Sequence, residues 1–179
     1  MNLFTYVRDV PDFPKPGITF RDITPLLAHP HGLRHIVGTM VDHLGGQFPL
    51  VVDMIVALDA RGFIIGGALA HHLQLPLVLV RKKGKLPFKT VGTSYGLEYG
   101  SDEIEMHADA IIKGDRALIV DDLLATGGTA RAACDLVEKL GGVVAGCFFL
   151  IELDGLGGRS KLGKYEVYSI LTYEQEKML

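Results

Sequence analysis

The segment at residues 117–129 reads ALIVDDLLATGGT. Its first four residues form a continuous apolar run, which is typical of a strand buried on both faces of a parallel sheet. Asp121 and Asp122 follow at the carboxyl end of that strand, and a short loop of glycines and threonines leads into a helix. Because ligands bind at the carboxyl edge of parallel sheets, this one segment predicts both a fold class and a ligand site.

The rest of the chain repeats this alternation of strand and helix. Short apolar runs predict further strands at residues 54–58, 77–80, 143–151 and 167–171, and one-sided apolar patterns predict helices at 33–44, at 62–73 and from the glycine loop to residue 140. The alternation indicates an α/β fold with a central, mostly parallel sheet flanked by helices. With 179 residues, the chain has the length of a single domain, residues 1–179.

Composition argues against several classes of partner and location. The chain has 18 Lys and Arg residues against 21 Asp and Glu residues, a net charge of −3, so no global positive field favours nucleic acid. The longest uncharged run, 62–80, contains two histidines, a glutamine and a proline, which favours a helix, a turn and a strand over a membrane span. The first residues lack the apolar region of a secretory signal, and Cys134 and Cys147 lie in apolar segments typical of reduced thiols. We therefore expect a cytoplasmic protein.

The loop after Asp122 has the features of a phosphate cradle. Gly127 and Gly128 let backbone N–H groups converge on one point, Thr126 and Thr129 add hydroxyl donors, and the helix N-terminus adds partial positive charge. The Lys-Ser or Lys-Thr pair of a P-loop does not follow the glycines, and the chain has no GxGxxG. The adjacent carboxylates repel each other unless they bind something polar or cationic, and ribose hydroxyls fit that requirement. The alternative is a tight turn with an aspartate N-cap, which needs only one aspartate.

A second predicted strand ends in LDARGF, residues 58–63. We expect Arg61 at the same ligand edge, where Gly62 permits close approach of the backbone, and a guanidinium there suits a second phosphate or a diphosphate. A structural ion pair between Asp59 and Arg61 is the alternative interpretation. Together the two segments suggest one ligand that carries phosphates at both ends of a sugar.

Residues 81–109 interrupt the alternation. Five Lys or Arg residues and no acid lie between Arg81 and Lys89, whereas five acids and no Lys or Arg lie between Glu98 and Asp109. This pattern predicts a long excursion from the sheet, a β-hairpin with a mobile tip, and such excursions are often functional. A solvated charged loop is the alternative. Nearer the N-terminus, four prolines among large apolar side chains at 11–25 predict an ordered loop with short extended pieces.

These motifs together resemble a known family. The 117–129 segment is similar to the signature with which type I phosphoribosyltransferases bind 5-phosphoribosyl-1-diphosphate (PRPP). Four further motifs resemble the adenine phosphoribosyltransferases, the adenine branch of that family: FPKPGITFRDITP at 13–25, DARGF at 59–63, RKKGKLP at 81–87 and SYGLEYG at 94–100. The resemblance runs in order through nearly the whole chain. It implies the type I phosphoribosyltransferase fold, with an N-terminal hood at 1–30 and a flexible catalytic hairpin at 81–109.

The resemblance also implies a reaction of purine salvage. Adenine and PRPP would form AMP and diphosphate, with Mg²⁺ as the cofactor and a homodimer as the assembly. In this family the 5-phosphate lies against a loop that matches Ala125, Thr126, Gly127, Gly128 and Thr129. The ribose hydroxyls lie against the positions of Asp121 and Asp122.

Further roles are carried over in the same way. The residues implied for diphosphate are Ala60, Arg61, Arg81 and Lys85, of which the last two act in part across the dimer interface. For adenine, backbone groups of Thr19 and Arg21 would meet the Watson–Crick edge, while Phe20 and Leu123 would sandwich the ring. Glu98, with Tyr99 beside it, is placed to handle the proton on the purine.

No dedicated metal site is expected. His29, His31 and His35 are too loosely spaced to indicate zinc, so Mg²⁺ would arrive bound to the diphosphate. Two other functions stay open at this point: a phosphoribosyltransferase for xanthine or for hypoxanthine and guanine, and a non-enzymatic regulator that keeps the PRPP site as a sensor. Glu98 and the basic segment favour catalysis, and no helix-turn-helix pattern supports a regulator that binds DNA.

Overall fold

A seven-stranded sheet forms the centre of the protein. The structure, a computed structural model, describes residues 1–46, 51–96 and 101–174. In the sheet the strands follow the order β5-β6-β4-β3-β7-β8-β9. Their bounds are β3 (Met54–Leu58), β4 (Leu77–Lys82), β5 (Thr90–Gly96), β6 (Ser101–His107), β7 (Arg116–Leu124), β8 (Val143–Asp154) and β9 (Val167–Glu174). Strands β4, β3, β7, β8 and β9 are parallel, so the predicted α/β fold with a mostly parallel sheet is confirmed.

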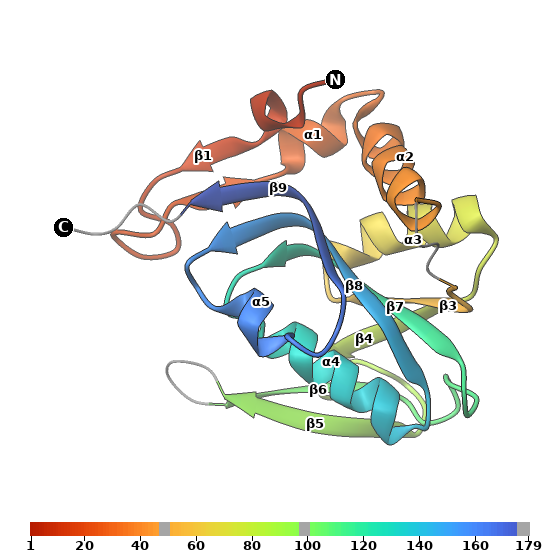
Figure 1. The fold of residues 1–179 in the computed structure, drawn as a ribbon. Coiled ribbons are helices and arrows are strands. Elements are labelled where there is room, and N and C mark those ends of the chain that lie inside the picture. Colours follow the sequence, from red (N-terminus) through yellow and green to blue (C-terminus); the bar gives the residue numbers. More distant parts are fainter. Residues whose placement is uncertain (47–50, 97–100, 175–179) are drawn as a thin grey trace.

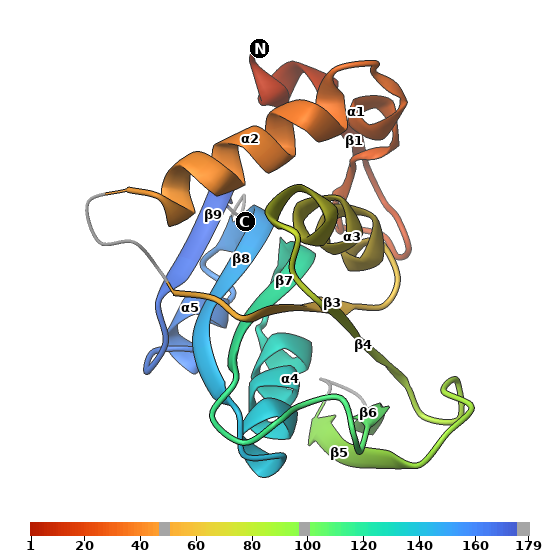
Figure 2. The same cartoon turned by 90° about the vertical axis from the view of Figure 1, so that its right-hand side faces the viewer.

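Helices cover both faces of the sheet, as Figure 2 shows, with α2 and α3 on one side of the strands and α4 on the other. The helical elements are η1 (Leu3–Tyr6), α1 (Thr24–Ala28), α2 (Gly32–Leu44), α3 (Gly62–Leu73), α4 (Gly128–Lys139) and α5 (Gly158–Lys161). No helix within the three described ranges is both long and apolar enough to cross a bilayer.

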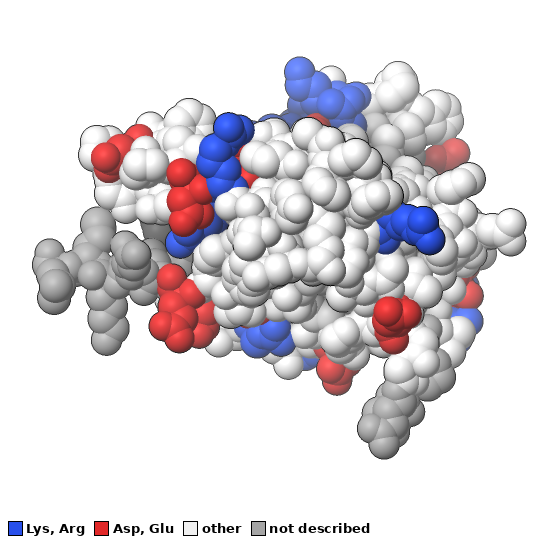
Figure 3. Space-filling view, turned by 90° about the horizontal axis from the view of Figure 1, so that it is seen from above, with Lys and Arg blue, Asp and Glu red and all other residues white. Residues whose placement is uncertain are grey.

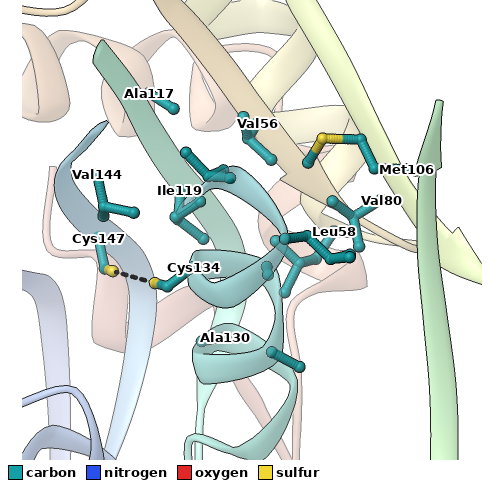
Figure 4. Packing of buried hydrophobic residues seen from close by; sticks show 14 of the residues in the cluster. Val56, Leu58, Val80, Met106, Ala117, Ile119, Ala130, Cys134, Val144 and Cys147 are labelled. Carbon is teal, nitrogen blue, oxygen red and sulfur yellow. Dashed lines mark hydrogen bonds between the residues drawn. The ribbon is translucent and has the colours of Figure 1, made fainter. Parts of the chain in front are cut away.

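The strands divide their side chains between two cores because successive residues of a strand point to opposite faces. In β7, Leu118 belongs to the cluster packed under α2 and α3, whereas Ile119 belongs to the cluster packed under α4. Figure 4 shows the second cluster, in which Cys134 of α4 faces Cys147 of β8. Both thiols are free and buried, with their sulfur atoms 3.7 Å apart.

The N-terminal segment forms a small antiparallel ribbon of β1 (Arg8–Val10) and β2 (Phe20–Asp22). These short strands within an ordered loop confirm the extended pieces predicted for this region. The ribbon lies on the side toward which the carboxyl ends of β8 and β9 point (Figure 1). Seen from above, the face over α1 and α2 is largely without Lys, Arg, Asp or Glu, and charged side chains gather around its margin (Figure 3).

The hairpin of β5 and β6 extends the sheet, which corrects the predicted excursion out of it. Strand β6 pairs antiparallel with β4 through Arg81 and Lys82, and β5 pairs with β6 along its whole length. Strand β5 consists mostly of small and polar residues and β6 carries three acids, so the sequence of this hairpin contains no continuous apolar run. The tip, residues 97–100, lies outside the described residues, and with it the predicted roles of Glu98 and Tyr99.

Candidate active site

A pocket of about 440 Å³ lies where the carboxyl ends of β3, β4 and β7 meet. This is the edge at which parallel sheets bind ligands. Three segments line it, Leu58–Arg61, Val80–Lys82 and Asp121–Ala130, together with side chains of Tyr95, Asp102 and Ile104 from the hairpin. The sheet therefore brings the two predicted motifs and the start of the basic segment to one cavity.

The predicted phosphate loop lies along this pocket with all five of its residues, Ala125–Thr129. Gly127 has a left-handed backbone with φ of 74°, a conformation that glycine adopts without strain. Helix α4 begins at Gly128, and the Gly127 carbonyl accepts a hydrogen bond from the Arg131 N–H at 2.9 Å. The unpaired N–H groups at this helix start and its partial positive charge can bind a phosphate.

The two aspartates differ sharply in environment. The Asp122 N–H donates to Asp121 Oδ1 at 2.8 Å, and Asp122 Oδ2 accepts from Arg61 Nε at 2.5 Å. Burial raises the pKa of Asp121 well above its ordinary range, and the adjacent Asp122 charge raises it further. Asp122, which is 7% exposed, has the guanidinium as its counter-ion. The pair can thus present two carboxyl groups in different environments to a bound sugar, Asp121 with a raised pKa and Asp122 paired with a guanidinium.

Each cation that lines the pocket is paired with a carboxylate. Besides the pair of Arg61 with Asp122, Arg81 Nε lies 3.0 Å from Asp59 Oδ2 and Lys82 Nζ lies 2.9 Å from Asp102 Oδ2. The alternative interpretation of the LDARGF segment, an ion pair between Asp59 and Arg61, is therefore wrong, because Asp59 pairs with Arg81 on the neighbouring strand. Ala60, also predicted to contact diphosphate, lines the same pocket.

Lys85 is exposed and is not among the residues that line the pocket. Its backbone is held instead: the carbonyl accepts from Arg81 Nη1 at 3.3 Å, and the N–H donates to Glu105 Oε1 at 3.1 Å. Glu105 is only 6% exposed and also accepts from the N–H groups of Gly84 and Leu86 and from the Thr90 hydroxyl. Burial by itself raises the pKa of Glu105, but these hydrogen bonds outweigh it and lower the pKa below the ordinary value.

The residues predicted for adenine are divided between two places. Leu123 lines the pocket, whereas the exposed Thr19 and the half-buried Phe20 and Arg21 belong to the hood. Phe20 is linked to the pocket through Arg61, whose guanidinium carbon lies 5.1 Å from the centre of the Phe20 ring. The Arg21 side chain pairs with Asp9 at 2.5 Å, which leaves only its backbone for the predicted role.

Sequence reasoning missed several residues of this site. Tyr95, Asp102 and Ile104 line the pocket from the hairpin, and Glu105 organises the basic segment beneath it. Tyr95 belongs to the SYGLEYG motif but was given no role, and the other three lie in a stretch whose charges look like those of a solvated loop. Within the described ranges no three His, Cys, Asp or Glu residues are grouped as a metal site would require.

Comparison with known proteins links this geometry to a family. The model of the phosphoribosyl transferase domain matches residues 22–175. The adenine phosphoribosyltransferase of Parvibaculum lavamentivorans is 50% identical over 177 residues, which are 97% of this chain and 99% of that protein. The crystal structure of adenine phosphoribosyltransferase from Thermoanaerobacter pseudethanolicus is 46% identical, covers 96% of this chain and 98% of its own, and superposes with a TM-score of 0.92. The Saccharomyces cerevisiae enzyme, crystallised with adenine and an imino-altritol bisphosphate, is 42% identical. It covers 93% of this chain and 95% of its own, with a TM-score of 0.89.

Proposed function

The chain belongs to the adenine phosphoribosyltransferase family, and we propose that it transfers the phosphoribosyl group of PRPP to adenine, forming AMP and diphosphate. One observation carries the proposal: the Ala125–Thr129 loop, the two aspartates and the Arg61 and Arg81 side chains line a single pocket. That set offers groups for each of the three parts of PRPP, a phosphate, a ribose and a diphosphate.

The PRPP molecule is assigned along this pocket by charge and donor chemistry. The N-terminal turn of α4 binds the 5-phosphate, because its N–H groups are free of intrahelical partners. The carboxyl groups of Asp121 and Asp122 accept from the ribose hydroxyls. Arg61 and Arg81 bind the diphosphate, for which planar guanidinium groups are well suited.

Adenine is assigned to the side of the pocket next to the hood. Leu123 lies at the pocket wall, and Phe20 stacks near Arg61 from the opposite element, so a planar base between them would contact apolar surface on both faces. Thr19 and Arg21 supply backbone groups for its Watson–Crick edge. A related enzyme of yeast crystallised with adenine supports this choice of base.

The reaction exchanges one bond at C1 of the ribose. The bond from C1 to adenine N9 forms, and the bond from C1 to the diphosphate oxygen breaks, with its electron pair leaving on diphosphate. Positive charge develops on the ribose and is stabilised by the ionised Asp122, while Arg61 and Arg81 stabilise the negative charge on the leaving group. The proton on the purine passes to a general base, the role assigned to Glu98.

Mg²⁺ would be held as part of the substrate, by the diphosphate of PRPP. Because no three carboxylates of the described residues are grouped as a metal site, the ion would take most of its oxygen ligands from the diphosphate and from water. When bound, it supplies additional positive charge on the leaving group.

We further assign a homodimer and a cytoplasmic location. Exposed apolar side chains, Leu77 at 40% and Phe88 at 59%, lie on the element that carries the basic segment and on the loop after it. Burial of these two side chains would favour association of two copies, and we assign Lys85, which is exposed outside its own pocket, to the diphosphate in the partner's pocket. Sedimentation velocity should give about twice the chain mass of 19.4 kDa. The buried free thiols support a reducing compartment, which cell fractionation tests.

The experiment that tests the reaction is a diphosphate-release assay with PRPP, Mg²⁺ and one nucleobase at a time. We expect turnover with adenine and a kcat/KM for guanine, hypoxanthine and xanthine lower by roughly 10⁴-fold, since a 6-oxo group leaves acceptors meant for an amine unpaired. Comparable rates with guanine would contradict the choice of base. Binding of PRPP with no turnover of any base would support a regulator in place of an enzyme.

A further inference from the structure

A four-residue helix lies directly behind the phosphate loop. Helix α5 begins at Gly158, and a side-chain carbon added to Gly158 would overlap the carbonyl oxygen of Ala125. Seen from the other side, a carbon added to Gly127 would lie 2.8 Å from the Gly158 carbonyl oxygen and 2.9 Å from its Cα. The two backbones are thus in direct contact, with no side chain between them.

An ion pair holds α5 in this place. Arg159 donates from Nε to Glu152 Oε1 at 2.8 Å and from Nη2 to Oε2 at 2.5 Å, and its Nη1 donates to the Val167 carbonyl at 2.8 Å. The Ser169 hydroxyl donates to Glu152 Oε2 at 2.6 Å. Glu152 is 6% exposed, so its carboxylate depends on these partners. A helix of four residues is not stable by itself, and its position follows from such contacts.

The carboxylate of this pair comes from the strand beside the phosphate loop. Glu152 of β8 is the register partner of Leu124, the last residue of β7, and Ala125 follows at once. Arg159 directly follows Gly158, which lies against the loop. The pair therefore joins the strand on which the loop begins to the segment that lies behind it.

We propose that Glu152 and Arg159 are positioning residues for the 5-phosphate of the substrate. They fix Gly158 against Ala125 and Gly127 and so set where the N–H groups of the loop point. Neither residue lines the pocket, and neither touches the ligand. The inference rests on the proposed function, because it assigns the phosphate to that loop, and it identifies how the loop is kept in its binding geometry.

The alternative is that the pair contributes only to folding. A second bidentate ion pair separates the two cases, although its carboxylate is more exposed, at 39% against 7% for the Glu152 side chain. Arg116 binds Asp53 in the same two-pronged way, with contacts of 2.8 Å from Nε and from Nη2. That pair lies at the amino end of β7, the end opposite to the pocket. Asp53→Asn therefore controls for the loss of a bidentate ion pair within the same sheet.

The experiment measures binding of ribose 5-phosphate, which carries the 5-phosphate without the diphosphate, together with hydrogen exchange of the Ala125–Thr129 amides. For Arg159→Gln and Glu152→Gln we expect ribose 5-phosphate to bind about tenfold more weakly, or weaker still, as when one charge-assisted hydrogen bond is misaligned. We also expect a raised KM for PRPP and faster exchange of the loop amides. Arg159→Lys, which keeps the charge but loses the fork, should fall between these variants and the wild type. Asp53→Asn should unfold more easily yet bind within about twofold of wild type, a difference near the size of ordinary measurement scatter.

Ser169→Ala removes a single hydrogen bond from Glu152 and serves if the charge variants do not fold. It should weaken binding in the same direction by a smaller factor. If the folded variants keep the wild-type affinity for ribose 5-phosphate and the wild-type exchange rates of the loop amides, the inference is overturned. The proposed function would then still stand, provided that the wild type is active. If the wild type neither turns over PRPP nor binds ribose 5-phosphate, the proposed function fails, and the exchange rates alone still decide whether the pair positions the loop.

Discussion

Replacement of Gly127 by alanine is the sharpest test of how the phosphate loop is built. The residue has φ of 74°, and a left-handed conformation costs a residue with a side chain about 1–2 kcal/mol. The added carbon would also lie 2.8 Å from the Gly158 carbonyl oxygen and 2.9 Å from the Gly158 Cα. Both are backbone atoms, so no rotamer change relieves the contact, and the loop and α5 must separate. The loss of unfolding free energy should therefore exceed the strain alone.

Separation of the loop from α5 turns N–H groups away from the phosphate. A hydrogen bond to a charged group contributes about 1.5–3 kcal/mol, so the loss of one such bond predicts roughly 10- to 100-fold weaker binding of ribose 5-phosphate. Gly114→Ala is the matched control. Gly114 also has a positive φ, 93°, but an added carbon meets no atom within 4 Å, and the residue lies near the amino end of β7.

Calorimetric titration with ribose 5-phosphate and urea unfolding of both variants decide the matter. We expect both to lose stability through backbone strain, with the larger loss in Gly127→Ala, and only that variant to lose affinity. If Gly127→Ala binds ribose 5-phosphate within about threefold of wild type, less than 0.7 kcal/mol, the close contact with Gly158 does not shape the phosphate site.

Four further substitutions test the other parts of the candidate site. Asp122→Asn should lower kcat on the order of 100- to 1,000-fold, because it removes a negative charge beside the developing ribosyl cation. Asp121→Asn should lower kcat less, because burial raises the pKa of that carboxyl group. If steady-state assays give both variants the kcat of the wild type, the ribose assignment is contradicted. Glu105→Gln should raise the KM for PRPP and destabilise the fold by about 1–3 kcal/mol. Because the pKa of Glu105 is lowered in the folded state, its contribution to the free energy of unfolding is full above the ordinary glutamate pKa and is lost as pH falls through the lowered value. The urea midpoints of wild type and variant should therefore approach each other in acid. Glu98→Gln should reduce the single-turnover rate by roughly 100- to 10,000-fold with PRPP affinity kept, and an unchanged rate would remove the proton-handling role.

The sequence predicted those strands and turns that are determined by residues close together in the chain. The strand at 117–120 and the glycine loop after it are recognisable because a doubly buried strand is apolar throughout and a sharp turn needs glycine. The sequence could not decide which glycine takes the left-handed conformation, since that depends on the path into α4; it is Gly127, and Gly128 opens the helix. The structure also extends the strand itself to Leu124, beyond the apolar run.

What the sequence did not predict depends on pairing between distant segments. Glu105 and Glu152 look like ordinary surface acids in their own stretches, yet both are buried. Glu105 accepts from the backbone of residues 84–86, and Glu152 accepts from the side chains of Arg159 and Ser169. The hairpin looked like an excursion because neither strand has a continuous apolar run and β6 carries three acids, and only its pairing with β4 shows that it continues the sheet. The hood has the same property, since its link to the pocket is the contact of Phe20 with Arg61.

The pairing of the pocket cations bears on how a diphosphate can bind there. Arg61 and Arg81 each pair with a carboxylate through Nε, at 2.5 and 3.0 Å. A guanidinium has five N–H donors, so both side chains keep donors for phosphate oxygens while the ion pairs stay in place. Asp122 is buried, and breaking its pair with Arg61 would leave that carboxylate without a counter-ion, which is costly. We therefore expect the diphosphate to bind the remaining guanidinium N–H groups, with each carboxylate holding its arginine in position.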